Sequence, residues 1–174
     1  CGAPRPIPLA PGIHWVPRGI DRVVKVEVTR TETVAIGFRA EDGGRTVSLS
    51  AEEGEWMTGD TNVLALKLAV QYRVARPVEW VASGAETPEL VRRAAESAVT
   101  GALGRLAVDE ALTGGRVRLL EEVRSATQGR LDAWRCGADV VSVALRSVDP
   151  PPAVVAAFQD VQNARSDRER FVNE

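Results

Sequence analysis

The feature that most constrains the fold is a long alternation of side chains at positions 62–74. One set of alternating positions holds mainly large apolar residues, and the positions between them hold smaller or polar ones. The first set is Asn62, Leu64, Leu66, Leu68, Val70, Tyr72 and Val74. Because successive side chains of a strand point to opposite faces, this pattern predicts a long strand with one apolar face. Such a strand needs partners at its edges and a layer that covers its apolar face.

The residues before the long strand predict further strands that are joined by turns. Short runs of alternating apolar residues predict strands at residues 21–28, 34–38, 46–50 and 55–58. The last of these leads into the long strand through a structural turn formed by Gly59, Asp60 and Asn62, where an Asp side chain binds its own backbone. The first half of the chain is therefore predicted to be a mostly antiparallel β-meander.

The second half changes to helical periodicity after Pro77, which suits the first position of a helix. The predicted helices cover residues 77–83, 87–106, 107–112 and 116–135. In the last of these, the side chains expected to face inward are Val117, Leu120, Val123, Leu131 and Trp134. Gly137 ends that helix in the usual role of glycine. A β-branched strand at 139–148 should pair with the long strand, so that two helices cover the sheet.

A final helix is predicted after the prolines at 150–152, and it carries a heptad seam. The positions proposed for oligomerisation along this seam are Val154, Ala157, Val161, Ala164 and Phe171. No helix stop signal follows Phe171, and the chain begins at Cys1 without an initiator Met. We therefore expect the chain to be a piece of a longer protein.

Together these elements predict an α+β fold. The expected division is an extended membrane-proximal segment at 1–12, a β-rich subdomain at 13–76, an α/β subdomain at 77–150 and a protruding C-terminal helix at 151–174. With 174 residues and 44% hydrophobic residues, the chain is long and apolar enough to bury a core.

The composition excludes several classes of function. A net charge of −2 is unlike the strongly basic balance of nucleic-acid-binding domains, so no nucleic-acid partner is expected. Two cysteines, Cys1 and Cys136, are too few for a disulfide framework. No apolar run is long enough to span a membrane.

The sequence predicts no catalytic residues, no metal site and no cofactor. His14 is the only histidine, and neither a zinc-ligand cluster nor a Gly-x-Ser-x-Gly elbow is present. Asp60 and Asn62 are interpreted as turn residues, because Asp in a hairpin turn binds its own backbone.

Several segments resemble, in order and spacing, the SPFH (band 7, prohibitin-homology) domain, and most of all its HflK branch. The resemblance covers nearly the whole chain from Pro11 onward. The segments that carry it are 11–15 with 20–23, 58–63 with 70–77, 106–112, 148–151 with Val154 and Phe158, and 159–174. The long excursion at 39–53, which is absent from stomatins and prohibitins, favours the HflK branch.

The resemblance implies a non-enzymatic scaffold with a membrane anchor upstream of Cys1 and a coiled coil downstream of Glu174. It implies homo-oligomers or assemblies with an HflC-like paralogue, and regulation of an FtsH-like membrane protease. It also implies a bacterial inner-membrane location with this domain on the periplasmic side. Two alternatives stay open: a stomatin-like organiser of lipid microdomains with another membrane partner, and a hydrolase subunit for which His14 is the only candidate base.

Overall fold

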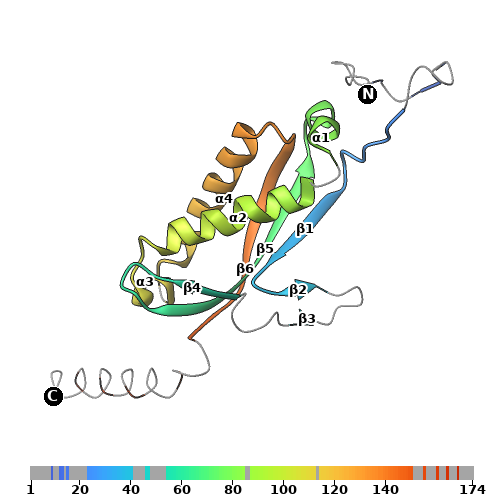
Figure 1. The fold of residues 1–174 in the computed structure, drawn as a ribbon. Coiled ribbons are helices and arrows are strands. Elements are labelled where there is room, and N and C mark those ends of the chain that lie inside the picture. The colour runs from blue at the N-terminus through green and yellow to red at the C-terminus, as the bar shows by residue number, and fades with distance from the viewer. Residues whose placement is uncertain are drawn as a thin grey trace.

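The structure is a computed structural model in which helices cover one face of an antiparallel sheet (Figure 1). It describes residues 23–40, 46–47, 54–84, 87–112 and 114–150, together with residues 9, 12, 13, 15, 155, 160, 164 and 168. The strands are β1 (Thr31–Ile36), β2 (Arg39–Ala40), β3 (Thr46–Val47), β4 (Glu55–Met57), β5 (Val63–Val74) and β6 (Ala138–Asp149). The helices are α1 (Pro77–Ser83), α2 (Thr87–Leu103), α3 (Val108–Leu112) and α4 (Arg116–Ala133). This confirms the predicted α+β class.

Strand β5 is the centre of the sheet. One of its edges pairs antiparallel with β1 and, nearer its start, with β4, and β6 runs antiparallel along the other edge. Strands β2 and β3 form a separate small ribbon. The predicted long strand is confirmed, except that Asn62 lies in the turn before it.

The apolar face of β5 forms the core with α2 and α4, which lie side by side across the sheet (Figure 1). From the sheet, the side chains at the centre of this cluster are Ile36, Leu64, Leu66, Leu68, Val70 and Tyr72. Tyr72 also donates a hydrogen bond of 2.6 Å from its hydroxyl to Glu32 Oε2. Burial and this carboxylate raise the pKa of Tyr72.

Two bulges keep β6 in phase with β5. Val141 and Arg146 have no partner on β5, so at each of them β6 holds one residue more than β5. A one-residue shift turns every following side chain to the other face, and a bulge absorbs that shift. The β6 side chains that share the helix-covered face with β5 are therefore Ala138, Val140, Val143, Leu145 and Val148.

Two expectations from the sequence are wrong. The predicted strand at 21–28 is not a strand within residues 23–28, where Val23, Val24 and Val28 are exposed. The valines alternate as in a strand, but none of the strands that the structure describes pairs with them, and pairing is what stabilises a strand.

The inward face predicted for the helix at 116–135, which is α4 in the structure, is also wrong in part. Val117 is 80% exposed and Trp134 is 47% exposed. The face that α4 buries follows a spacing of four residues through Leu119, Val123, Thr127 and Leu131. Val117 lies off this stripe, and Trp134 follows the last residue of the helix.

We expect substitution of Val70 by alanine to lower the free energy of unfolding by about 2–3 kcal/mol, because it leaves a cavity between sheet and helices. Val141→Ala is the matched control. Val70 is fully buried, whereas Val141 lies in a bulge and is 48% exposed, so the control should change stability by less than about 0.5 kcal/mol. Urea unfolding followed by circular dichroism measures both, and equal losses would contradict this description of the core.

Candidate functional site

The turn between β4 and β5 is bound to the connection between α2 and α3. The backbone N–H of Gly59 donates to the carbonyls of Leu103, at 3.1 Å, and Leu106, at 2.9 Å. A Cβ atom on residue 59 would lie 2.8 Å from the carbonyl oxygen of Gly104, so only glycine allows this close approach. Two segments distant in sequence are thereby held backbone to backbone.

Asp60 completes this junction with its carboxylate. Its Oδ2 accepts a hydrogen bond of 3.1 Å from the backbone N–H of Val108, the first residue of α3. Its Oδ1 accepts one of 2.5 Å from the hydroxyl of Thr58, which also contacts the carbonyl of Asn62 at 3.0 Å. Asn62 Nδ2 lies 3.4 Å from the Asp60 carbonyl. The carboxylate thus satisfies a helix N–H that has no partner within the helix.

These hydrogen bonds lower the pKa of Asp60 from 3.8 to about 2. The largest cause is the Thr58 hydroxyl, and the Val108 N–H is second. Donors that bind the ionised form favour it over the protonated form. Asp60 is therefore a structural carboxylate that is ionised at neutral pH.

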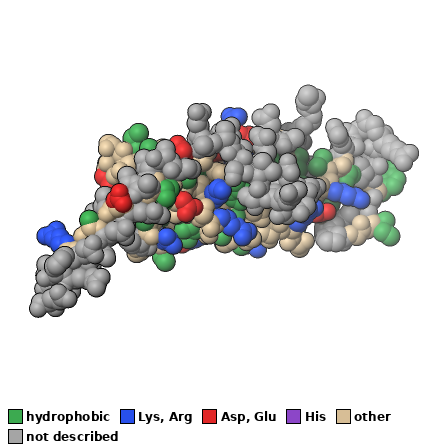
Figure 2. All heavy atoms as spheres, turned by 90° about the horizontal axis from the view of Figure 1, so that it is seen from below, with side chains coloured by type: hydrophobic (Ala, Val, Ile, Leu, Met, Phe, Trp, Pro, Cys, Tyr) green, Lys and Arg blue, Asp and Glu red, His purple; other side chains and the backbone are tan. Residues whose placement is uncertain are grey.

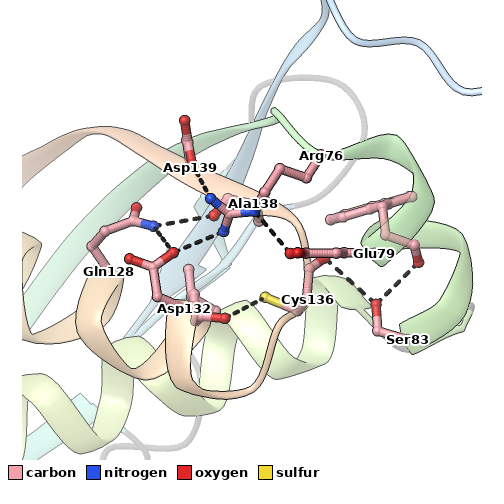
Figure 3. A network of polar contacts seen from close by, with 10 residues as sticks. Arg76, Glu79, Ser83, Gln128, Asp132, Cys136, Ala138 and Asp139 are labelled. Atoms are coloured by element: carbon pink, nitrogen blue, oxygen red, sulfur yellow. Dashed lines mark hydrogen bonds and ion pairs between the residues drawn. The ribbon is translucent and has the colours of Figure 1, made fainter. Parts of the chain in front are cut away.

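A second polar cluster lies at the other end of the sheet, around Arg76 (Figure 3). Its guanidinium donates to Glu79 Oε2 at 2.8 Å and to Asp132 Oδ1 at 2.7 Å, and Nη1 lies 3.9 Å from Asp139 Oδ1. The hydrogen bond with Asp132, followed by that with Glu79, raises the pKa of Arg76. One side chain thus joins α1, α4 and the start of β6.

Sequence reasoning did not single out Arg76, Asp132 or Asp139. The pair Arg76 and Glu79, three residues apart at the start of a helix, was a visible signal. The partners from α4 and β6 are more than fifty residues away, and no local pattern indicates them.

Gly137 fixes the same end of the sheet through its backbone. Its carbonyl accepts hydrogen bonds of 3.0 Å from the N–H groups of Ala75 and Arg76. Its φ is +73°, and a Cβ would lie 2.4 Å from the carbonyl oxygen of Arg76 and 2.7 Å from the amide nitrogen of Trp80. The predicted role of Gly137 at the end of α4 therefore extends to contact between α1 and the sheet.

Gln128 of α4 forms hydrogen bonds with the backbone of β6 along the outer edge of that strand, which is the edge that does not pair with β5. Its Nε2 donates a hydrogen bond of 3.3 Å to the carbonyl of Ala138 (Figure 3). Its Oε1 accepts one of 2.7 Å from the N–H of Val140. A carbonyl and the N–H two residues later point to the same side of a strand, so this side chain replaces a neighbouring strand there. The edge from Ser142 to Asp149 has no such cover among the described residues.

The described parts of the chain hold no group of three or more His, Cys, Asp or Glu residues that could bind a metal. Cys136 is buried, burial raises the pKa of its thiol, and Sγ donates to the Leu131 carbonyl at 3.4 Å, which suits a packing role rather than a nucleophile. His14 and Cys1 lie outside the described residues.

Most of the residues predicted for oligomerisation also lie outside the described parts of the chain. Val154, Ala157, Val161 and Phe171 are not described, whereas Ala164 lies in a helical conformation and is exposed. Where the structure describes helices, none is long and apolar enough to cross a membrane. Seen from below, Lys and Arg side chains gather near the middle of the molecule with acidic side chains beside them, so this face carries both signs of charge (Figure 2).

Comparison with known proteins agrees with this architecture. The sequence profile of the family described as "SPFH domain / Band 7 family" matches residues 1–174. The chain is 32% identical over 94% of its length to Protein HflK of Vibrio cholerae, and covers 38% of that protein. It is 29% identical to Protein HflK of Treponema pallidum over 95% of its length, and covers 52% of that protein.

A further relative carries a name that describes a role. The chain is 27% identical over 94% of its length to "Modulator of FtsH protease HflK" of Escherichia coli, and covers 35% of that protein. The chain thus spans about a third to a half of the length of the curated relatives that it matches.

We expect the stability that Asp60 contributes to be present above pH 4 and to be lost as the pH falls from about 4 towards 2. The sign follows because the pKa is lowered from 3.8 to about 2 in the folded protein, so the unfolded chain takes up the proton first. Carboxyl ¹³C NMR of Asp60 should titrate near pH 2. Thr58→Val, which removes the strongest donor, should raise that midpoint, and an unchanged midpoint would contradict the assigned cause.

We expect Gly137→Ala to lower the free energy of unfolding by about 3 kcal/mol or more, because it combines a left-handed φ with a backbone clash. Gly129→Ala is the matched control: it makes the same substitution but is expected to change the free energy of unfolding in the opposite direction. Gly129 is exposed within α4 and a Cβ there meets nothing within 4 Å, so alanine should raise stability by about 0.5–1 kcal/mol. Denaturant unfolding distinguishes the two, and loss of stability in both would contradict the described contacts.

Proposed function

The chain belongs to the SPFH domain / Band 7 family, and from that premise we propose that it is a membrane-associated, non-catalytic scaffold domain. In this proposal it oligomerises and regulates a membrane protease of the FtsH type. The observation that carries the proposal is the similarity, over 94% of the chain, to HflK proteins, one of which is named a modulator of FtsH protease.

The way in which polar side chains link elements in the described parts of the chain supports a structural role. Asp60 binds the start of α3, Arg76 joins α1 to α4 and β6, and Gln128 covers part of a strand edge. Each of these groups is already engaged in holding elements together. A catalytic acid or base must instead reach a substrate within hydrogen-bonding distance.

The membrane environment and the partners follow from the family resemblance. We propose an anchor upstream of Cys1, a bacterial inner-membrane location and a periplasmic position of this domain. The partners are further copies of the chain or an HflC-like paralogue, and the regulated enzyme is an FtsH-like protease.

The internal organisation remains a prediction. The boundaries at 12, 76 and 150 separate proposed units, although β5 and β6, which fall in different units, pair in one sheet. The seam through Val154, Ala157, Val161, Ala164 and Phe171 is proposed as an assembly surface of the last helix.

Mass measurement in detergent, on the protein with its anchor and downstream helix, tests the assembly. We expect a defined oligomer that copurifies with the FtsH-like protease of the same organism. Val161→Glu should lower the assembled fraction by about tenfold, which corresponds to about 1.4 kcal/mol, because it places a charge in the seam. Val155→Glu, one residue off the seam, is the matched control and should assemble normally.

A strict monomer in that experiment would contradict the scaffold proposal. Copurification with another membrane protein instead of the protease would favour the stomatin-like alternative. Hydrolysis by the purified protein that is abolished by His14→Ala would favour the hydrolase alternative.

A further inference from the structure

The segment directly before β1 has the sequence of a strand without the pairing of one. We call residues 23–30 the N-terminal arm. Its valines alternate, yet Val23, Val24 and Val28 are 56%, 54% and 44% exposed, and residues 23–28 belong to no strand. The backbone bends at Val28 and Thr29, so the direction of the arm is separate from that of β1. Figure 1 shows the arm running away from the sheet at the start of β1.

The sheet has an edge that such an arm fits. The first part of the outer edge of β6 is occupied by Gln128, and from Ser142 to Asp149 the structure shows no partner among the residues it describes. An unpaired edge presents a row of N–H and C=O groups to which a further strand can bind. Main-chain pairing of this kind is a common mode of recognition.

The arm cannot reach this edge within its own chain. It leads directly into β1, and β1 and β6 lie on opposite edges of β5. Strands are spaced by about 4.8 Å, so the arm would have to pass three spacings, about 14 Å, across the sheet. From Val28, the last valine of the arm, to Thr31 of β1 the chain has three residue steps, which span at most about 11 Å and fall short of that distance. An arm that pairs with the β6 edge must therefore come from a second copy.

The apolar residues of arm and edge match in one antiparallel register. With Val26 opposite Val148, the bulge in β6 brings Val28 opposite Leu145. Residues directly opposite each other share a face of the sheet. Val148 and Leu145 belong to the face that packs on the helices, so the valines of the arm would extend that core.

The charges match in the same register. Lys25 falls opposite Asp149, and Glu27 falls beside the bulge at Arg146. In the structure Glu27 lies 3.7 Å from Arg30, but both side chains are about three-quarters exposed, so this contact is weak and easily exchanged. If the arm moved by two residues toward Leu145, Lys25 would instead lie beside Arg146. Repulsion between these two positive charges disfavours that register.

We propose that the N-terminal arm of one copy adds as an antiparallel strand to the Ser142–Asp149 edge of β6 in a second copy. This inference rests on the proposed scaffold function and gives its oligomerisation a contact within the sheet, separate from the heptad seam. Each copy offers both an arm and an acceptor edge. The pairing can therefore repeat from copy to copy and close into a dimer or ring.

Disulfide trapping tests the register directly. The double variant Lys25→Cys/Asp149→Cys, with Cys1→Ser in the background, is oxidised in membranes of expressing cells and as the purified chain. Directly opposite residues of an antiparallel pair are close enough for a disulfide. We expect the yield of covalent oligomers from Lys25→Cys/Asp149→Cys to be at least about tenfold higher than the yield from Lys25→Cys/Arg118→Cys. Strand pairing brings the two thiols together only in the first of these variants.

A matched pair of substitutions at other positions distinguishes specific pairing of the arm from random collisions between chains. Val26→Asp should abolish the covalent product, whereas Val117→Asp, at an exposed position of α4, should leave it unchanged. Equal yields from the two cysteine pairs would overturn the proposal. So would Val26→Cys/Thr33→Cys closing within single chains in high yield, since the arm would then be a hairpin on its own β1. If the protein is oligomeric in detergent while no cross-link forms, the arm proposal fails and the scaffold function stands.

Discussion

The structure depends on the pairing of both edges of β5. This strand alternates large apolar side chains with small or polar ones, and the large ones face α2 and α4. Its ladder with β6 brings residues 138–149 beside residues 65–74, although α1, α2, α3 and α4 lie between the two segments in the sequence. Without that ladder, the helices would have only half a sheet to cover. The two bulges of β6 follow from the same requirement, because they return its apolar residues to the face that the helices bury.

Local chemistry was sufficient to predict much of this fold. Alternation identified β5, Pro77 and Gly84 bounded α1, and glycine marked the end of α4. The errors arose where local pattern and tertiary context disagree. The arm has the alternation of a strand but no partner strand among the described residues. Val117 has the hydrophobicity of a core residue but lies off the face that α4 buries.

The contacts that define the two polar junctions could not be read from local pattern. Asp60 was identified as a turn residue, but its bond to Val108 joins positions 48 apart. Arg76 reaches Asp132 across 56 positions, and Gln128 covers an edge whose existence depends on how β6 pairs. Such contacts depend on the completed fold. The glycines were better signals, because Gly59 and Gly137 lie where one backbone approaches another too closely for a Cβ.

The positions of β1 and β6 have a mechanical consequence. The chain enters the sheet at the start of β1, leaves it at the end of β6, and these points lie on opposite edges and at opposite ends of β5. A pull between Thr31 and Asp149 therefore acts along the strands, and each ladder is loaded in shear. Its hydrogen bonds must then break together, whereas a pull across a strand opens them one at a time. A domain connected in this way can transmit tension between its two ends while its core stays folded.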